Sequence, residues 1–78
     1  MKKILIIDDD IMTTKLLERL LSDKSYNVEI TNSSLKATVL MKQKNYDVII
    51  TDLNMPEVNG FELLLWLKKN NIKSKIII

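Results

Sequence analysis

Short runs of aliphatic residues alternate along the chain with longer amphipathic stretches. The runs at residues 4–7, 26–30, 47–51 and 74–78 are short and rich in isoleucine and valine, which favours β-strands. The stretches at residues 11–23, from residue 33 onward, and at residues 60–69 place apolar residues at helical spacing. The pattern therefore predicts the element order β-α-β-α-β-α-β.

Local signals support three of these elements. In the first helix Met12, Leu16 and Leu20 are spaced by four, which is the period of one helix face. Ser33 or Ser34 is placed to cap the second helix, because a serine oxygen accepts hydrogen bonds from the first free N–H groups. The second predicted strand alternates polar and apolar residues, which predicts a place at the edge of the sheet.

Alternation of strands and helices predicts an α/β fold with a parallel sheet and helices on its faces. Seventy-eight residues allow one small domain. In sheets of this type, ligands bind at the carboxyl ends of the strands, where the strand order reverses. Polar residues that follow the strands are therefore the candidates for a functional site.

Acidic residues follow two of the predicted strands. Asp8, Asp9 and Asp10 come after the first strand, and Asp52 comes after the third. If these strands are neighbours, the carboxylates converge, and their mutual repulsion favours a bound cation such as Mg²⁺ with oxygen ligands. The alternative is that the three consecutive aspartates only cap the first helix. We expect Asp10 to be the cap and the two earlier acids to be the ligands.

Composition excludes several classes of function. The chain has no cysteine and no histidine, so it has no disulfide, thiolate metal site or histidine nucleophile. The net charge is only +2 and the twelve basic residues are scattered along the sequence, so no nucleic acid or membrane partner is expected. The lysines at the start resemble a signal peptide, but three aspartates follow the apolar run at once. A cytoplasmic location is the expectation.

Three segments resemble the receiver domain of two-component response regulators. The resemblance covers the whole chain, and the stretch from Asp52 to Gly60 is its most specific part. It implies a flavodoxin-like fold with the strand order 2-1-3-4. The segments that carry it are Leu5–Asp10, Asp47–Pro56 and Asn59–Leu64.

The resemblance implies a role for each matching residue. Asp52 corresponds to the phosphoacceptor, and Asp8 and Asp9 to the acidic pair that holds Mg²⁺. Asn54 corresponds to the position whose main-chain carbonyl completes the metal site, and Met55-Pro56 to the loop at the rim. The implied phosphoryl donor is a histidine kinase, a phosphotransfer protein or a small acyl phosphate. A receiver of this kind is a phosphoacceptor domain and no enzyme in the usual sense.

The sequence departs from the family pattern at its carboxyl end. Residues 1–78 correspond to a receiver domain that stops before the fifth strand. The family places a switch serine or threonine after the fourth strand and a phosphate-binding lysine after the fifth, and neither position is present. Lys73 and Lys75 cannot replace that lysine, because they stand where the fourth strand begins, at the opposite end of the sheet from the site. We therefore expect an incomplete domain.

Two surfaces are candidates for contact with other chains. Leu65 and Trp66 lie on the otherwise polar side of the third helix and predict either a contact surface or a helix buried nearly all round. Ile76, Ile77 and Ile78 form a strand whose outer edge is open, and an open edge can pair with a second chain. We therefore expect a homodimer or an aggregate.

Two alternative functions remain beside the receiver. The residues 8–13 loosely resemble the acidic loop of haloacid-dehalogenase-type phosphohydrolases, but that resemblance leaves residues 52–56 unexplained. The chain could also be a non-signalling interaction module that dimerises through its sheet edge or third helix.

Overall fold

The computed structural model describes residues 2–51 and 60–77 of the chain. All seven predicted elements are present in the predicted order, and their bounds agree with the predicted ones to within one residue. No helix in these ranges is long and apolar enough to cross a membrane. The elements are β1 (Lys3–Ile7), α1 (Ile11–Ser22), β2 (Asn27–Thr31), α2 (Ser34–Gln43), β3 (Val48–Thr51), α3 (Gly60–Lys69) and β4 (Lys75–Ile77).

The strands form one parallel sheet in the order β2-β1-β3-β4, which confirms the predicted topology. β1 lies between β2 and β3, and its Ile7 stands opposite both Thr31 and Thr51. β2 is an edge strand, as its polar residues predicted. β4 pairs with β3 and forms the other edge of the described sheet.

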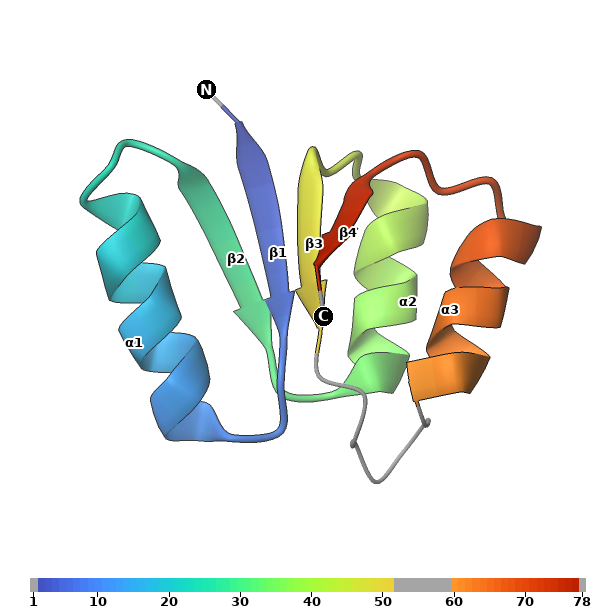
Figure 1. The fold of residues 1–78 in the computed structure, drawn as a ribbon, viewed down its shortest axis with the longest axis horizontal. Coiled ribbons are helices and arrows are strands. Elements are labelled where there is room, and N and C mark those ends of the chain that lie inside the picture. Colours follow the sequence, from blue (N-terminus) through green and yellow to red (C-terminus); the bar gives the residue numbers. More distant parts are fainter. Residues whose placement is uncertain (1, 52–59, 78) are drawn as a thin grey trace.

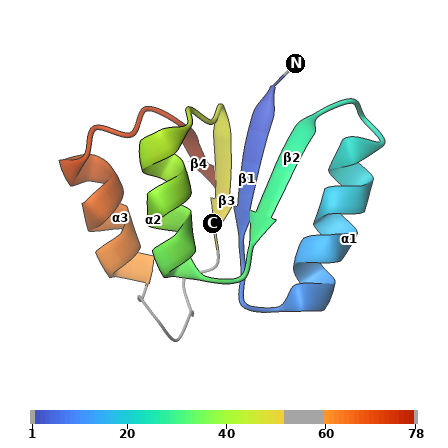
Figure 2. The ribbon, with the colours of Figure 1, turned by 180° about the vertical axis from the view of Figure 1, so that it is seen from behind.

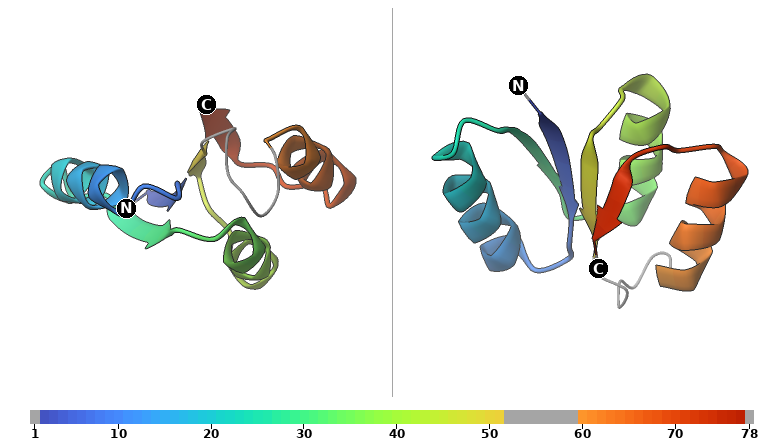
Figure 3. Two further views of the ribbon diagram at one scale, coloured as in Figure 1. Left: turned by 90° about the horizontal axis from the view of Figure 1, so that it is seen from below. Right: turned by 45° about the horizontal axis from the view of Figure 1, so that its top comes forward.

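Helices cover both faces of the sheet. α1 lies on one face, while α2 and α3 lie together on the other (Figures 1 and 2). A view along the strands shows this layering and leaves α1 as the only described helix on its face (Figure 3). The main core lies under α2 and α3, where buried strand residues meet buried helix residues. Its members are Leu5, Ile7, Ala37, Met41, Tyr46, Ile49, Leu63 and Leu67.

The apolar stripe that identified α1 is not the buried side of that helix. Met12 is 81% exposed, and Leu16 and Leu20 are more than half exposed. The buried side carries Thr14, which is fully buried, with half-buried leucines beside it. A period of four marks a helix, but it does not state which of two adjacent apolar sides meets the sheet.

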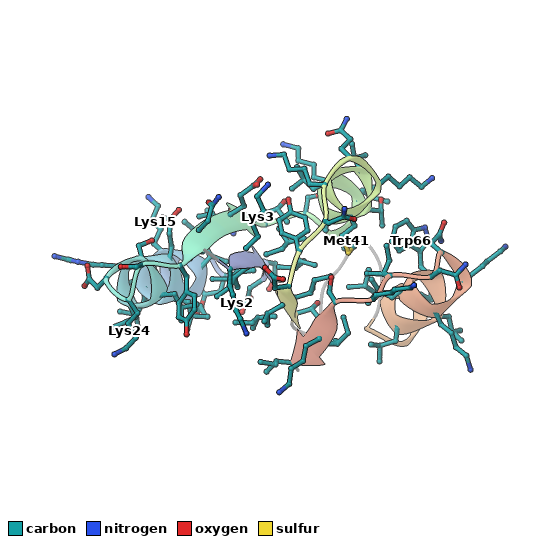
Figure 4. All side chains as sticks on the ribbon, turned by 90° about the horizontal axis from the view of Figure 1, so that it is seen from above. Lys2, Lys3, Lys15, Lys24, Met41 and Trp66 are labelled. Atoms are coloured by element: carbon teal, nitrogen blue, oxygen red, sulfur yellow. The ribbon has the colours of Figure 1, made fainter. Side chains whose placement is uncertain are left out.

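The surroundings of α3 correct one prediction and confirm another. Leu65 is 67% exposed, as expected for the polar side. Trp66 does not face solvent: it is half-buried and packs against the core cluster. Its ring lies between α3 and α2, near Met41, and the ammonium of Lys42 is 5.9 Å from the ring centroid (Figure 4). Of the two alternatives for this side of the helix, the packing of Trp66 favours burial, because α3 contacts a second helix as well as the sheet.

Candidate functional site

The turn after β1 holds Asp8 in a fixed position at the carboxyl end of the sheet. Its backbone N–H donates to the carbonyl of Thr31 (3.2 Å), and its carbonyl accepts from the side-chain amide of Asn32 (2.9 Å). Its Oδ1 accepts from the N–H of Asp10 (3.0 Å). Asp8 is half-buried, whereas Asp9 is exposed. Hydrogen bonds of the Asp8 backbone with Thr31 of β2 and with Asn32 thus hold the acidic pair at the end of β1.

Asp10 is the N-cap of α1, as the sequence predicted. Its Oδ1 accepts from the N–H groups of Met12 (3.0 Å) and Thr13 (3.5 Å). Its Oδ2 accepts from the hydroxyl of Thr13 (2.9 Å). The hydrogen bond from the Thr13 side chain is the largest cause that lowers the pKa of Asp10 below its ordinary value. Asp10 is therefore committed to the helix, which leaves Asp8 and Asp9 as the candidate ligands.

Asn32 belongs to this site although the sequence analysis did not single it out. Its amide group donates to the carbonyl of Asp8 and to the hydroxyl of Thr14 (3.2 Å). It thereby links the end of β1, the start of α1 and the loop after β2. The signal that could have found it is its position, because Asn32 follows β2 as Asp8 follows β1.

The remaining predicted site residues lie beyond the described ranges. Thr51, the last residue of β3, is buried and pairs with Ile7. Asp52 and Asn54 fall outside the described residues, so their convergence with the acidic pair stays a prediction. Within residues 2–51 and 60–77, no three acidic, histidine or cysteine side chains form a group that could hold a metal ion.

The other candidates lie away from this end of the sheet. Lys73 and Lys75 stand before and at the start of β4, at the opposite end, as predicted. Ile76 is half-buried and Ile77 is 44% exposed on the outer strand. Ile78 falls outside the described residues. The acidic end and the open strand edge are therefore separate surfaces.

Comparison with known proteins gives the family. The sequence profile described as "Response regulator receiver domain" matches residues 4–78. The chain belongs to this family. Receivers of this family are typically phosphoacceptors rather than catalytic enzymes, and this membership leaves the dehalogenase-type alternative without support.

Curated relatives are longer proteins. The chain is 46% identical over 74 residues to a probable transcriptional regulator, ycf29, of Pyropia yezoensis. It is 34% identical over 76 residues to the cell cycle response regulator CtrA of Brucella ovis. The match covers 95% and 97% of this chain, respectively, but only 33% of each relative. The receiver chain thus spans about a third of the length of these proteins.

Solved receivers share the fold. The response regulator TrrA of Thermotoga maritima, in complex with Mg²⁺ and BeF, is 31% identical with a TM-score of 0.91, covering 100% of this chain and 68% of TrrA. The chemotaxis response regulator CheY4 of Vibrio cholerae is 31% identical with a TM-score of 0.92, covering 97% of this chain and 65% of CheY4. TrrA has also been solved in complex with the histidine kinase ThkA. These neighbours establish a two-component receiver fold for this chain.

Proposed function

We propose that this receiver accepts a phosphoryl group on Asp52 in a Mg²⁺-dependent reaction. The observation that carries the proposal is the register of β1 and β3, in which Ile7 stands opposite Thr51. Asp8 follows Ile7 in the sequence and Asp52 follows Thr51, so the acidic pair and the proposed acceptor leave adjacent parallel strands. Adjacent strands lie about 4.8 Å apart.

A carboxylate at this position can act as a nucleophile toward phosphorus. An oxygen of Asp52 would attack the phosphorus atom of the donor and form an acyl phosphate. The bond from phosphorus to the donor's nitrogen or oxygen breaks, and the electron pair leaves with the donor. Phosphoryl transfer needs mainly positioning and charge neutralisation, so a small acidic site is sufficient.

The donor atoms of the acidic pair suit a hard divalent cation. Asp8 and Asp9 offer carboxylate oxygens, and Mg²⁺ commonly binds through one or two carboxylates while it keeps several waters. We assign Asp8, Asp9, Asp52 and the main-chain carbonyl of Asn54 to this ion. When bound, the ion supplies neutralisation of charge on the phosphoryl oxygens.

Residues 1–78 contain no histidine, so they supply no phosphohistidine donor of their own. A histidine kinase or phosphotransfer protein is the proposed partner, and the complex of TrrA with the kinase ThkA supports this choice. A small acyl phosphate would serve as a donor of the same chemistry. The test is phosphorylation of the chain and its Asp52→Asn variant with Mg²⁺ and an acyl phosphate.

A chimera makes this test independent of the family positions that lie beyond residue 78. Residues 1–78 would replace the matching part of TrrA, since the structural match covers 100% of this chain and 68% of TrrA. Retention of phosphorylation by the chimera, with loss in its Asp52→Asn variant, supports the proposal. Phosphorylation that survives in the variant rejects Asp52 as the acceptor.

A second candidate function is assembly through the open sheet edge. Ile77 is 44% exposed on β4, which forms one edge of the described sheet. An exposed β-branched edge strand can pair with a second copy. Size-exclusion chromatography with light scattering tests this proposal, since a monodisperse, cooperatively melting monomer would reject it.

A further inference from the structure

Basic residues that are scattered in the sequence gather at one end of the folded domain. Lys2 and Lys3 stand at the start of β1, and Lys73 and Lys75 stand at the start of β4. The strands are parallel, so these four lysines lie at the same end of the sheet. We call this end, where the strands start and the helices finish, the amino pole. Figure 4 looks down on it and shows Lys2 and Lys3 there.

The helices add further basic residues to the amino pole, because each helix runs antiparallel to the strands and ends there. Ten of the twelve basic residues of the chain thus belong to this pole, and Lys15 and Lys36 are the other two. The six from the helix ends are Arg19, Lys24, Lys42, Lys44, Lys68 and Lys69.

Few acids balance this charge. Glu29 pairs with Lys44 (2.9 Å), and the carboxylate of Asp47 accepts from the backbone N–H of Lys3 (2.8 Å). Asp23, which follows α1, and Glu18, which precedes Arg19 in that helix, are the other acidic residues toward this end. Among the described residues, the opposite end carries three consecutive aspartates and Glu62. Positive charge is therefore concentrated at one end of the domain and negative charge at the other, although the net charge is small.

Stabilisation of helix ends explains only part of this arrangement. A lysine in the last turn of a helix interacts favourably with the helix dipole, which accounts for Lys42, Lys68 and Lys69. The four lysines at the strand starts gain nothing comparable, because strands have little net dipole. Lys73 and Lys75 also have no ion pair with any described acid. The strand-start lysines therefore need another explanation.

An open cavity lies at the amino pole between the ends of α2 and α3. Its volume is about 760 Å³, and its polar lining combines three lysines (42, 44 and 73) and the asparagines 45, 70 and 71 with one acid, Asp47. Ammonium and amide groups donate hydrogen bonds, so the lining suits a ligand that accepts them. Such a concave surface with several ammonium groups suits a polyanion.

The chemistry of the pole favours nucleic acid over the other polyanions. Lysine is depleted in protein interfaces, which instead use aromatic and apolar anchors. Of the exposed large apolar residues, Tyr26 before β2 and Leu20 near the end of α1 lie at this end, so a membrane finds little to insert. Lysine and asparagine side chains and backbone N–H groups are common ligands of DNA phosphates. The longest dimension of the domain, 32 Å, lies across the pole and is close to one turn of B-DNA, about 34 Å.

We propose that the amino pole binds the phosphate backbone of duplex DNA without regard to sequence. This inference goes beyond the proposed phosphoryl transfer, because the two surfaces lie at opposite ends of the sheet. The expectation of no nucleic acid partner rested on the small net charge and on the scatter of basic residues along the sequence, and the fold removes the second of these premises. The contact is electrostatic. It would orient the domain on the duplex and raise its local concentration there, but it would not recognise bases.

Fluorescence anisotropy with a labelled 20-base-pair DNA duplex tests the proposal. At about 50 mM salt the chain should bind two unrelated duplex sequences equally well. Between low and physiological salt, the logarithm of the binding constant should fall against the logarithm of the salt concentration with a slope of about −3.6 or steeper. That slope corresponds to roughly four phosphate contacts at about 0.9 each.

Two double variants that each lose two positive charges separate the effect of the pole lysines from the effect of net charge. Lys42→Gln with Lys73→Gln should make the slope shallower by about 1.8, or about 0.9 per lost contact. Lys15→Gln with Lys36→Gln should leave the slope unchanged, since these lysines lie outside the pole. Circular dichroism confirms that each variant is folded before binding is compared.

Four outcomes overturn the proposal. They are an absence of duplex binding at low salt, equal effects of the two double variants, tighter binding to phosphatidylserine vesicles than to the duplex, and tighter binding to polyglutamate. The last two outcomes would assign the pole to a membrane or to an acidic protein instead.

Discussion

Ile7 of β1 stands directly opposite Thr51 of β3 in adjacent parallel strands. Both side chains are buried, so the two strand ends are fixed relative to one another by the core. The acidic pair follows the first of these residues in the chain and the proposed acceptor follows the second. This single register relation makes the carboxyl end of the sheet the place where the proposed chemistry converges.

We expect Mg²⁺ to stabilise the domain through the acidic pair. A ligand that binds only the folded state raises stability by mass action, by about 2.7 kcal/mol at a concentration 100 times its dissociation constant. Mg²⁺ should therefore raise the melting temperature, and Asp8→Asn with Asp9→Asn should remove this response. Glu18→Gln, which changes an acid in the middle of α1, is the control and should retain it. An equal response in all three proteins would exclude the acidic pair as ligands.

The cap of α1 predicts a pH dependence. Asp10→Ala should lower the melting temperature at neutral pH by about 5 °C, because two backbone N–H groups and a hydroxyl lose their acceptor. The pKa of Asp10 is lowered in the folded state, so its charge contributes stability above the ordinary value of 3.8. That contribution is lost as the pH falls through the folded pKa.

Asp10→Asn is the matched control for this effect. Asparagine caps helices as well as aspartate does, but it carries no charge. The difference in melting temperature between the native chain and Asp10→Asn should therefore vanish in acid, while the cost of Asp10→Ala should partly remain. A difference that grows in acid would contradict the assigned direction of the pKa.

Trp66 should matter for stability rather than for association. Trp66→Ala should lower the free energy of unfolding by about 2 kcal/mol, because a half-buried ring that packs on the core is removed. Lys42→Gln should cost about 0.5 kcal/mol through the lost cation–π contact. Leu65→Ala, on the exposed side of the same helix, should stay within about 0.5 kcal/mol. Urea unfolding measures all three, and a stable Trp66→Ala variant with altered sedimentation would instead indicate an interface.

The turn after α1 contains a residue whose replacement by glycine should stabilise the domain. Ser25 has φ 65°, in the left-handed region, while the N–H of Tyr26 donates to the carbonyl of Leu21 and closes the helix. Ser25→Gly should raise the free energy of unfolding by about 0.5 kcal/mol, because glycine adopts this conformation without strain. Asn71 has φ 55°, and Asn71→Gly should change stability less, since asparagine tolerates this region. A loss of stability in Ser25→Gly would contradict this account.

The topology could be predicted because the relevant signals are local or follow from the family resemblance. Short isoleucine-rich runs between amphipathic stretches gave the element order, and Asp10 and Ser33 gave the helix starts. The acidic pair could be found by its position after a buried strand. Asn32 obeys the same positional rule, but a single asparagine after an edge strand gave no separate chemical signal.

The sequence could not give the features that depend on tertiary packing. Trp66 lies on the side of α3 that seemed polar, but α2 covers that side. The stripe through Leu16 gave the correct helix and the wrong buried side, because an adjacent apolar side meets the sheet. Lys2 before β1 and Lys73 before β4 are 71 residues apart in sequence, and only the parallel sheet brings them to one end.

The central claim is that Asp52 is the phosphoacceptor, and intact-mass spectrometry tests it most directly. The TrrA chimera that carries residues 1–78 is incubated with Mg²⁺ and an acyl phosphate, beside its Asp52→Asn variant. We predict a mass increase of one phosphoryl group that depends on Mg²⁺ and is absent from the variant. The same mass increase in Asp52→Asn would contradict the account.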